Sequence, residues 1–334
     1  MGVEVSVALT VRNEAGSIRE TLSALASQTL KPAEVVVADG GSTDGTPELV
    51  EEFAGSSPVP VRLLRLPRCN RSVGRNAAVR ATRCEIVAMT DGGCVADNRW
   101  LEELTSPFLW PNPPDVVAGY YEPIIEDIWD AAVGVALVPP PDEVDPENFL
   151  PSSRSIAFRK GAWRAVGGYP EHLSHNEDTP FALALRRAGF KFAFAPGAIV
   201  RWRVHKSPLR VFWQYLRYAY GDGEAGLFFR HYLKLGVYGL AGAALKVKAL
   251  RAPALAVLST YALKQLVHRW RRAREPVIAL LSMVYIFALD AGQCVGYLSG
   301  WARRMASALT IPDEPLGIAP QIDENYNLSE GGRR

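Results

Sequence analysis

The stretch that decides the fold reads EVVVADGGSTDG and occupies residues 34–45. Its first half is a run of apolar, mostly β-branched residues, which is typical of a buried β-strand. The run stops at Asp39, and the residues after it are Gly, Ser, Thr and Asp, which favour turns. The sequence therefore predicts a strand over residues 34–38 with a polar loop at its carboxyl end.

The same arrangement recurs on both sides of this stretch. Further strands are predicted at residues 3–11, 61–66, 85–90 and 155–159. Helical patterns are found at residues 17–25, 47–53, 72–81, 100–108 and 179–188. Ser17 and Glu20 predict a capping box at the first of these helices. Strands that alternate with helices predict an α/β fold, with a mostly parallel sheet covered by helices on both sides.

Polar residues follow three of the predicted strands, at residues 10–14, 39–44 and 91–93. One such cluster alone would indicate only a turn, because Asp and Gly are ordinary turn residues. The carboxyl ends of parallel strands meet at one edge of a sheet, and ligands bind there. We therefore expect the three clusters to converge. Their carboxylates and backbone amides suit a nucleoside diphosphate and a hard cation.

The composition of the 334 residues is that of a folded protein, with 48% apolar and 22% charged residues. A formal charge of +2 predicts no nucleic-acid partner. No basic stretch followed by an apolar run is found at the N-terminus, so no signal peptide is predicted. The four cysteines form no C-x-x-C pair, which indicates reduced thiols in a cytosolic compartment.

The charge is divided unevenly along the chain. Residues 227–304 contain 12 Lys and Arg against two acids, a charge of +10, which leaves −8 for the remainder. Apolar runs at 235–245 and 252–263 are short for a membrane span, and a longer run at 276–301 is interrupted by Asp290 and Gln293. Apolar helices beside basic residues predict association with the cytoplasmic face of a membrane, either as a hairpin in one leaflet or as full spans. A helical subdomain with a basic surface, away from any membrane, is the alternative.

Residues 6–14 and 34–46 resemble the opening of family-two glycosyltransferases with the GT-A fold. Later stretches match the same family in the same order, at residues 74–76, 90–94, 167–171 and 177–178. The resemblance covers residues 3–217. It implies a GT-A domain at residues 1–205, followed by a helical, basic, membrane-associated region at 206–310 and a polar tail at 311–334.

The resemblance implies a binding site for a nucleotide-diphosphate sugar. Its residues in this chain would be Thr10, Asn13, Glu14, Asp39, Gly41, Arg75 and Asp91. Thr10, Asn13 and Glu14 would line the nucleoside pocket. Asp39 would accept a hydrogen bond from the base, unless its carboxylate caps the turn that follows. Arg75 would approach the donor phosphates, unless it is a solvated helix residue.

Asp91 matches the first carboxylate of the family's D-x-D motif, whose second position is Gly93 here. A divalent cation, Mg²⁺ or Mn²⁺, would stabilise the charge of the departing diphosphate, and one carboxylate can hold it when phosphates supply further oxygens. His205 is a candidate second ligand, although a single His is more often structural. The missing second Asp puts the use of metal in doubt.

The resemblance assigns the general base of an inverting transfer to Asp178, with Glu177 orienting it. The alternative for both is a role as helix N-terminal charges. The implied reaction is a hexosyl transfer to an acceptor hydroxyl, on a lipid-linked or polysaccharide precursor of the cell envelope. Residues 212–226 are expected to pack the helical region onto the sheet, with coverage of the acceptor site as the alternative.

Two other functions stay open at this stage. A sugar-phosphate nucleotidyltransferase builds a similar pocket, but the segment at residues 12–14 lacks the Gly-rich basic loop expected of it. A non-catalytic relative that binds nucleotide sugars is the second alternative, prompted by Gly93. A dinucleotide-binding oxidoreductase is disfavoured because no G-x-G-x-x-G follows the first strand.

Overall fold

A computed structural model describes residues 3–273 and 275–310 of the chain. One eight-stranded sheet forms its centre, in the order β3-β2-β1-β4-β7-β6-β8-β5. The strands are β1 (Val5–Val11), β2 (Glu34–Asp39), β3 (Val61–Arg65), β4 (Ile86–Asp91), β5 (Cys94–Ala96), β6 (Val116–Pro123), β7 (Ile156–Arg159) and β8 (Phe192–Trp202). Strands β1 to β4 are parallel as predicted, whereas β7 is antiparallel to both of its neighbours and β5 is antiparallel to β8. The sheet is therefore mixed.

Strand register brings the predicted polar clusters together. Thr10 at the end of β1 lies opposite Asp91 of β4, and its neighbour Val11 lies opposite Asp39 of β2. Both pairings are parallel, so all three strands end at the same edge of the sheet. Strand pairing thus places Asp39 and Asp91 at the same edge of the sheet, on either side of β1.

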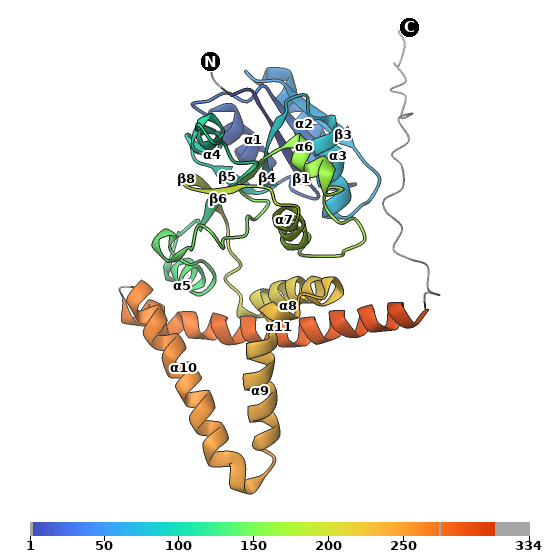
Figure 1. Ribbon diagram of the computed structural model, residues 1–334. Coiled ribbons are helices and arrows are strands. Elements are labelled where there is room, and N and C mark those ends of the chain that lie inside the picture. The colour runs from blue at the N-terminus through green and yellow to red at the C-terminus, as the bar shows by residue number, and fades with distance from the viewer. Residues whose placement is uncertain (1–2, 274, 311–334) are drawn as a thin grey trace.

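Both faces of the sheet are buried, because alternate residues of each strand enter different cores. Val7 and Leu9 enter one core, while Ala8 between them enters the other. Helices α1 (Ile18–Ala26), α2 (Thr46–Ser56) and α4 (Trp100–Thr105) pack on the first face. Helices α3 (Arg71–Ala81), α6 (Lys160–Ala165) and α7 (Asp178–Arg187) pack on the second. We call residues 3–127 and 138–202 the α/β body (Figure 1).

The capping box predicted at α1 does not form. The Ser17 hydroxyl donates instead to Glu14 Oε2, 2.6 Å away, and makes no bond to the backbone of its own helix. The hydroxyl is thus turned toward Glu14, and its oxygen accepts no hydrogen bond from the N–H groups of the first helical turn. A capping box is found at α5 (Ile128–Leu137), between Asp127 and Asp130.

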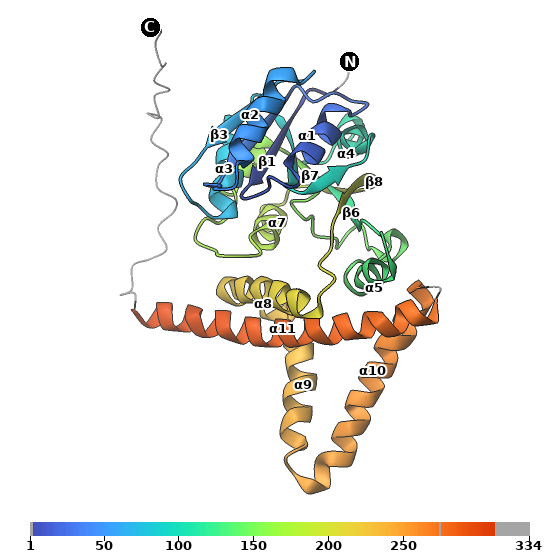
Figure 2. The ribbon, with the colours of Figure 1, turned by 180° about the vertical axis from the view of Figure 1, so that it is seen from behind.

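The remaining helices form a layer under the α/β body, and we call α5 and α8–α11 the helical layer (Figures 1 and 2). Helices α8 (Pro208–Ala225), α9 (Tyr232–Ala244), α10 (Arg251–Ala273) and α11 (Pro276–Thr310) follow β8 in the chain. Helix α11 runs beneath α8, and the α9–α10 hairpin projects away from the body. The predicted boundary at residues 205/206 lies between the end of β8 and the start of α8, and it stays a prediction.

Three glycines let α11 approach α8 closely. A Cβ at Gly292, Gly296 or Gly300 would collide with a backbone carbonyl oxygen of α8. Their spacing of four residues places them on one face of α11. Helix α8 therefore packs along α11, and it also contacts the α/β body at Asn176 and Arg154, so it lies between the two.

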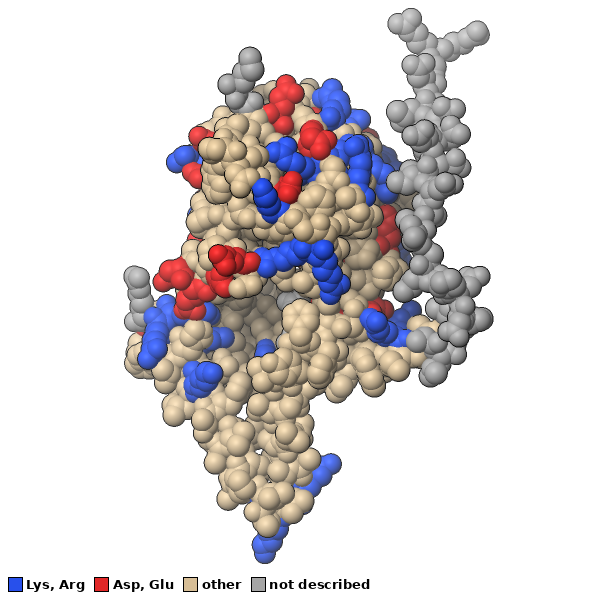
Figure 3. Space-filling view, viewed as in Figure 1, with Lys and Arg blue, Asp and Glu red and all other residues tan. Residues whose placement is uncertain are grey.

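The hairpin exposes apolar side chains along its length. Leu240 of α9 and Leu263 of α10 are 75% and 61% exposed. Figure 3 shows a largely uncharged middle stretch of the hairpin, with basic side chains near its tip, where the sequence has Lys246, Lys248 and Arg251. Further cations of α10, Lys264, Arg269, Arg271 and Arg272, lie toward its other end. Among the described residues, one helical segment, Pro276–Ser307 of α11, is long and apolar enough to cross a membrane by length and composition. The predicted tail at 311–334 lies outside the described residues.

A buried polar cluster joins the three helices α9, α10 and α11. Asp290 of α11 accepts hydrogen bonds from Tyr238 (2.8 Å) and Tyr261 (2.7 Å) and pairs with Lys234 (2.6 Å). Lys234 also donates to Gln293 at 2.6 Å. We call these five residues the layer cluster. Asp290 and Gln293, which interrupt the apolar run in the sequence, are therefore the points at which the hairpin is fastened to α11.

Candidate active site

A cleft of about 760 Å³ opens between the edge of the sheet and the helical layer. On one side it is lined by the segment at residues 10–14 and by Asp91, Gly92 and Gly93. On the other side it is lined by residues 202–205 and by Gln214 and Tyr218 of α8. Helix α8 thus forms part of the cleft wall, in line with the alternative that aromatic residues here cover a binding site.

The loop after β1 is held in shape by the loop after β2. Asn13 has a left-handed backbone (φ 57°), its N–H donates to Ser42 Oγ (2.8 Å), and its side-chain oxygen accepts from the Thr43 N–H (2.9 Å). The N–H of Glu14 donates to Thr46 Oγ1 at 2.8 Å. These contacts preform the loop that carries the predicted nucleoside-pocket residues.

Asp39 is buried and caps the turn that follows it. Its carboxylate accepts from the N–H groups of Gly41 (3.2 Å) and Ser42 (3.0 Å) and from the Ser42 hydroxyl. Gly41 has φ 79°, and a Cβ there would press on the backbone of Arg68, so the turn requires glycine. Neither Asp39 nor Gly41 lines the cleft, although Gly40 between them does. Contact of Asp39 with a nucleobase stays a prediction.

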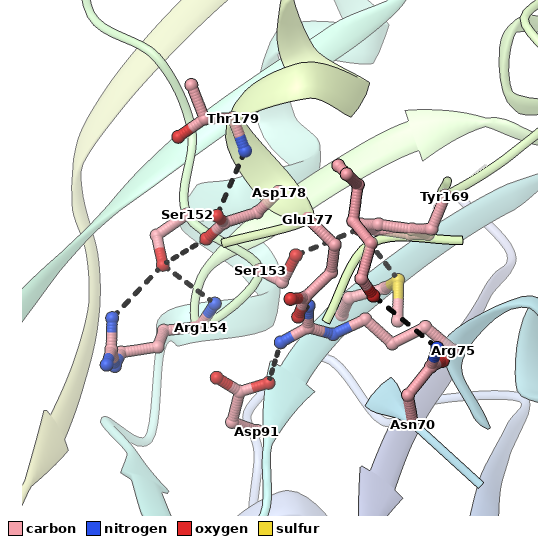
Figure 4. A network of polar contacts seen from close by, with 12 residues as sticks. Asn70, Arg75, Asp91, Ser152, Ser153, Arg154, Tyr169, Glu177, Asp178 and Thr179 are labelled. Carbon is pink, nitrogen blue, oxygen red and sulfur yellow. Dashed lines mark hydrogen bonds and ion pairs between the residues drawn. The ribbon is translucent and has the colours of Figure 1, made fainter. Parts of the chain in front are cut away.

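Arg75 is buried and joins two carboxylates from distant parts of the chain. Its guanidinium pairs with Asp91 Oδ1 (2.7 Å) and with Glu177, and it lies over the ring of Tyr169. Burial opposes the charge of Arg75, but Asp91 and Glu177 outweigh that cost and raise its pKa. Contact of Arg75 with donor phosphates stays a prediction, because both of its terminal nitrogens are taken up by carboxylates (Figure 4).

Asp178 lies beside this ion pair at the start of α7. Its Oδ2 accepts from Ser152 Oγ (3.3 Å) and its Oδ1 from the Thr179 N–H (2.9 Å) (Figure 4). We call Arg75, Asp91, Glu177 and Asp178 the cleft cluster. Burial, and then the charge of Glu177, raise the pKa of Asp178 above its ordinary value. A carboxylate of raised pKa is suited to taking up a proton.

The pKa of Asp91 is shifted in the opposite direction. Burial opposes its ionisation, but Arg75 and Arg154 hold its pKa below the ordinary value. Environments that push the pKa values of two acids apart allow one to stay charged while the other exchanges a proton. The cleft cluster therefore offers one permanent anion, Asp91, and one candidate base, Asp178.

Arg154 is a cleft residue that the sequence reasoning missed. Its guanidinium lies over the rings of Trp202 (5.2 Å) and Tyr121 (5.7 Å) and contacts Tyr218 and Ser152 (3.3 Å each). Within the described part of the chain, no carboxylate forms an ion pair with it. An Arg just ahead of a predicted strand gives no signal in one sequence, because its neighbours come from β6, β8 and α8.

The cleft can accept a divalent cation only if the substrate supplies ligands. Asp91 and His205 both line it, but the described residues contain no group of three or more His, Cys, Asp or Glu side chains arranged for a metal ion. Burial and Arg210 lower the pKa of His205, which favours the neutral imidazole that binds metals. One carboxylate with diphosphate oxygens satisfies Mg²⁺ or Mn²⁺, so the residues present fit such an ion.

Comparison with known proteins points to one family. Residues 6–136 match the family described as Glycosyl transferase family 2. Glycosyltransferase AglE of Haloferax volcanii is 28% identical over 203 residues, which are 58% of this chain and 65% of AglE. Succinoglycan biosynthesis protein ExoA of Rhizobium meliloti is 27% identical over 250 residues, 66% of this chain and 68% of ExoA. The chain thus spans just under two thirds of AglE.

A solved structure shares the fold. Mannosyltransferase PcManGT from Pyrobaculum calidifontis, solved in complex with GDP-Man and Mn²⁺, matches with a TM-score of 0.59 and 22% identity. The match covers 85% of this chain and 87% of PcManGT. It therefore extends past the α/β body into the helical layer and shows a GT-A fold.

Proposed function

Because the chain carries a family 2 glycosyltransferase domain with a GT-A fold, we propose that it transfers a sugar from a nucleoside-diphosphate sugar to an acceptor hydroxyl, with inversion. The relatives support the use of an activated sugar, since PcManGT binds GDP-Man and ExoA takes part in succinoglycan biosynthesis. The acceptor is a lipid-linked or polysaccharide precursor of the cell envelope, met at a membrane surface.

One observation carries this proposal: Arg75 joins Asp91, which lines the cleft, to Glu177, and the pKa of the adjacent Asp178 is shifted in the opposite direction to that of Asp91. In the proposed reaction Asp178 takes the proton of the acceptor hydroxyl as that oxygen attacks the anomeric carbon. The nucleoside diphosphate leaves from the opposite side of the sugar. No covalent intermediate is needed.

Asp91 and His205 would hold a divalent cation against the diphosphate oxygens. When bound, the cation supplies positive charge to the leaving group. Glu177 fixes Arg75 in place, and Arg75 in turn orients the Asp91 carboxylate. The residues of this chain thus position the phosphates and remove the proton.

Arg154 supports an acceptor with an anionic group. Its guanidinium lies at the part of the cleft formed by Trp202 and by Tyr218 of α8, and it touches Ser152, the partner of Asp178. A planar guanidinium without a carboxylate partner suits a phosphate. A lipid-linked precursor would place such a phosphate at this side of the cleft.

The helical layer supports a membrane location. Helix α11 satisfies the length and apolarity of a span, yet it packs along α8 through Gly292, Gly296 and Gly300. We propose that α11 lies along the membrane surface and that the α9–α10 hairpin enters the bilayer. The exposed Leu and Val side chains of the hairpin would contact lipid, and the exposed Lys264 and Arg271, toward the α11 end of α10, would contact anionic headgroups.

A donor screen tests the transferase proposal. Thermal unfolding of the full chain is measured with UDP-linked, GDP-linked and other nucleotide sugars, with and without Mg²⁺ or Mn²⁺. A true donor at a hundredfold excess over Kd adds about 2.7 kcal/mol to the unfolding free energy. Release of nucleoside diphosphate with an acceptor extract then measures transfer. Failure of every donor to stabilise the protein or to be consumed would refute the proposal.

Vesicle binding tests the membrane location. Leu240→Glu changes the hairpin side chain that is 75% exposed, and Leu109→Glu changes a 63% exposed side chain of the α/β body. We expect the first variant to lose sedimentation with phosphatidylglycerol vesicles and the second to retain it. Equal binding by both variants would contradict insertion of the hairpin.

A further inference from the structure

The backbone leading into Glu177 and Asp178 is held by α8. Asn176 has a left-handed conformation (φ 58°), and its side-chain amide donates to Asp222 Oδ1 of α8 at 2.6 Å. A left-handed residue other than glycine is uncommon and persists where its surroundings hold it. Asp222 is 3% exposed, so the Asp222 side of this hydrogen bond is shielded from water.

Two further contacts join the same loop to the end of α8. A Cβ at Gly221 would collide with the carbonyl oxygen of His175, so the two backbones touch. The Ser174 hydroxyl donates to Glu224 Oε2 at 2.6 Å. Three consecutive residues of the loop therefore rest on about one turn of α8, immediately before the cleft cluster.

The second carboxylate oxygen of Asp222 faces the hairpin. Its Oδ2 lies 2.7 Å from Nε2 of His231, the residue immediately before α9, and His231 is also 3% exposed. The imidazole stacks on Tyr297 of α11, with ring centroids 4.8 Å apart. Asp222 thus bridges the loop of the candidate base and the root of the hairpin.

The side chains around His231 are apolar and exposed. Phe228, Phe229 and Tyr232 are 56%, 57% and 48% exposed, although His231 between them is buried. Aromatic residues of this kind are enriched where a protein meets the membrane interface. A lipid surface that contacts these rings would therefore fix the position of His231.

We propose that Asp222 is a positioning residue that couples the membrane-facing root of the hairpin to the candidate base Asp178. This inference rests on the proposed glycosyl transfer. Contact of Phe228, Phe229 and Tyr232 with lipid orders His231, Asp222 holds Asn176, and Asn176 sets the direction of the chain at Glu177 and Asp178. Turnover is then highest on the membrane, where a lipid-linked acceptor is found.

Variants of Asp222 in the full chain test this coupling. Asp222→Ala removes both contacts, and we expect kcat on phosphatidylglycerol vesicles to fall by about 10- to 100-fold with an unchanged donor KM, since misplacing a reacting group costs that much. Asp222→Asn keeps an oxygen that accepts from Asn176, so it should restore most of the rate. His231→Ala should lower kcat on vesicles to the level that wild type shows without them.

The matched control is Asp290→Asn, which alters another buried carboxylate of the helical layer that makes no contact with the loop at 174–176. It should leave kcat unchanged. An equal loss of kcat in Asp290→Asn would show that general loosening of the layer is responsible and would overturn the proposal. Full activity of Asp222→Ala would overturn it as well.

Hydrogen exchange gives a readout that does not depend on turnover. In wild type, phosphatidylglycerol vesicles should slow amide exchange at residues 174–178, and in Asp222→Ala this protection should vanish. If vesicles protect the hairpin but leave 174–178 unchanged in wild type, the coupling is wrong. If no donor is consumed while this protection is seen, the proposed function fails and the coupling stands.

Discussion

Two buried groups of charged side chains in this protein look alike in composition but differ in their surroundings. The cleft cluster and the layer cluster each contain a carboxylate with a cationic partner, Asp91 with Arg75 and Asp290 with Lys234. Asp290 has two tyrosine donors as well and is only 2% exposed. The cleft cluster instead holds two further acids, Glu177 and Asp178, and its Asp91 lines a large cavity.

The difference shows what makes a buried charge structural or reactive. Asp290 of α11 has partners on α9 and α10, so its charge is satisfied and holds the three helices together. Asp178 has a hydroxyl and a backbone N–H as its hydrogen-bond partners and the charge of Glu177 beside it, so its pKa is raised. We therefore infer that the first cluster supports the fold and that the second supports chemistry. The following predictions test that division.

The largest effect, a loss of turnover, is expected for Asp178→Asn. The amide keeps the size of the side chain but cannot take a proton, so kcat should fall by about 10²–10⁴-fold while donor KM changes little. Initial rates of nucleoside-diphosphate release measure this. Asp290→Asn, the equivalent change in the layer cluster, should keep the wild-type kcat. Normal turnover of Asp178→Asn would remove Asp178 from the mechanism.

A smaller effect, on stability, is expected for Gly296→Ala. The new methyl group would collide with the carbonyl oxygen of Leu216, so α8 and α11 must move apart at a cost of about 1–3 kcal/mol. Gly236→Ala in α9 is the matched change, because a Cβ there meets nothing within 4 Å. It should stabilise the helix by about 0.5–1 kcal/mol. The midpoints of denaturant unfolding of the two variants measure these changes, and equal midpoints would contradict close packing of α8 on α11.

The layer cluster itself should contribute to stability. Asp290→Asn loses the charge that pairs with Lys234 and keeps only part of the hydrogen bonding to Tyr238 and Tyr261, so the unfolding free energy should fall by about 1 kcal/mol. Thermal unfolding in phosphatidylglycerol vesicles measures this. An unchanged midpoint would mean that the cluster does not hold the hairpin.

The smallest effect concerns pH. Because the pKa of Asp178 is raised, the acid limb of the kcat/KM profile should lie above pH 3.8, the ordinary pKa of an Asp side chain. Activity should increase as pH rises through this limb. Glu177→Gln removes the neighbouring charge and should move this limb to lower pH by less than about one unit. A limb that moves to higher pH would assign the titration to another group.

Stability should change in the opposite direction over the same pH range. Between the ordinary and the raised pKa of Asp178, the folded state keeps a proton that the unfolded state has lost, so the unfolding free energy falls as pH rises through this window. Asp178→Asn should remove this pH-dependent part of the unfolding free energy. The midpoints of denaturant unfolding of the variant and of wild type, compared across the acid pH range, measure the difference.

The amino-acid sequence by itself determined the strands, the turns and the edge of the sheet at which the polar residues meet. β-branched runs that end in Asp and Gly specify a strand and its turn through interactions within a few residues. Parallel pairing of β1, β2 and β4 then places Thr10, Asp39 and Asp91 together, as the pattern predicted. Local chemistry suffices for these features.

Only the tertiary structure decided which side chains became partners. Arg75 pairs with Glu177, 102 positions away in the chain, and Asn176 bonds Asp222 across 46 positions. Ser17 donates to Glu14 and leaves its own helix uncapped. In each case a polar group binds the strongest partner that packing brings within reach, because an unpaired polar group costs free energy once water is excluded. That choice depends on contacts between segments that the local sequence pattern does not contain.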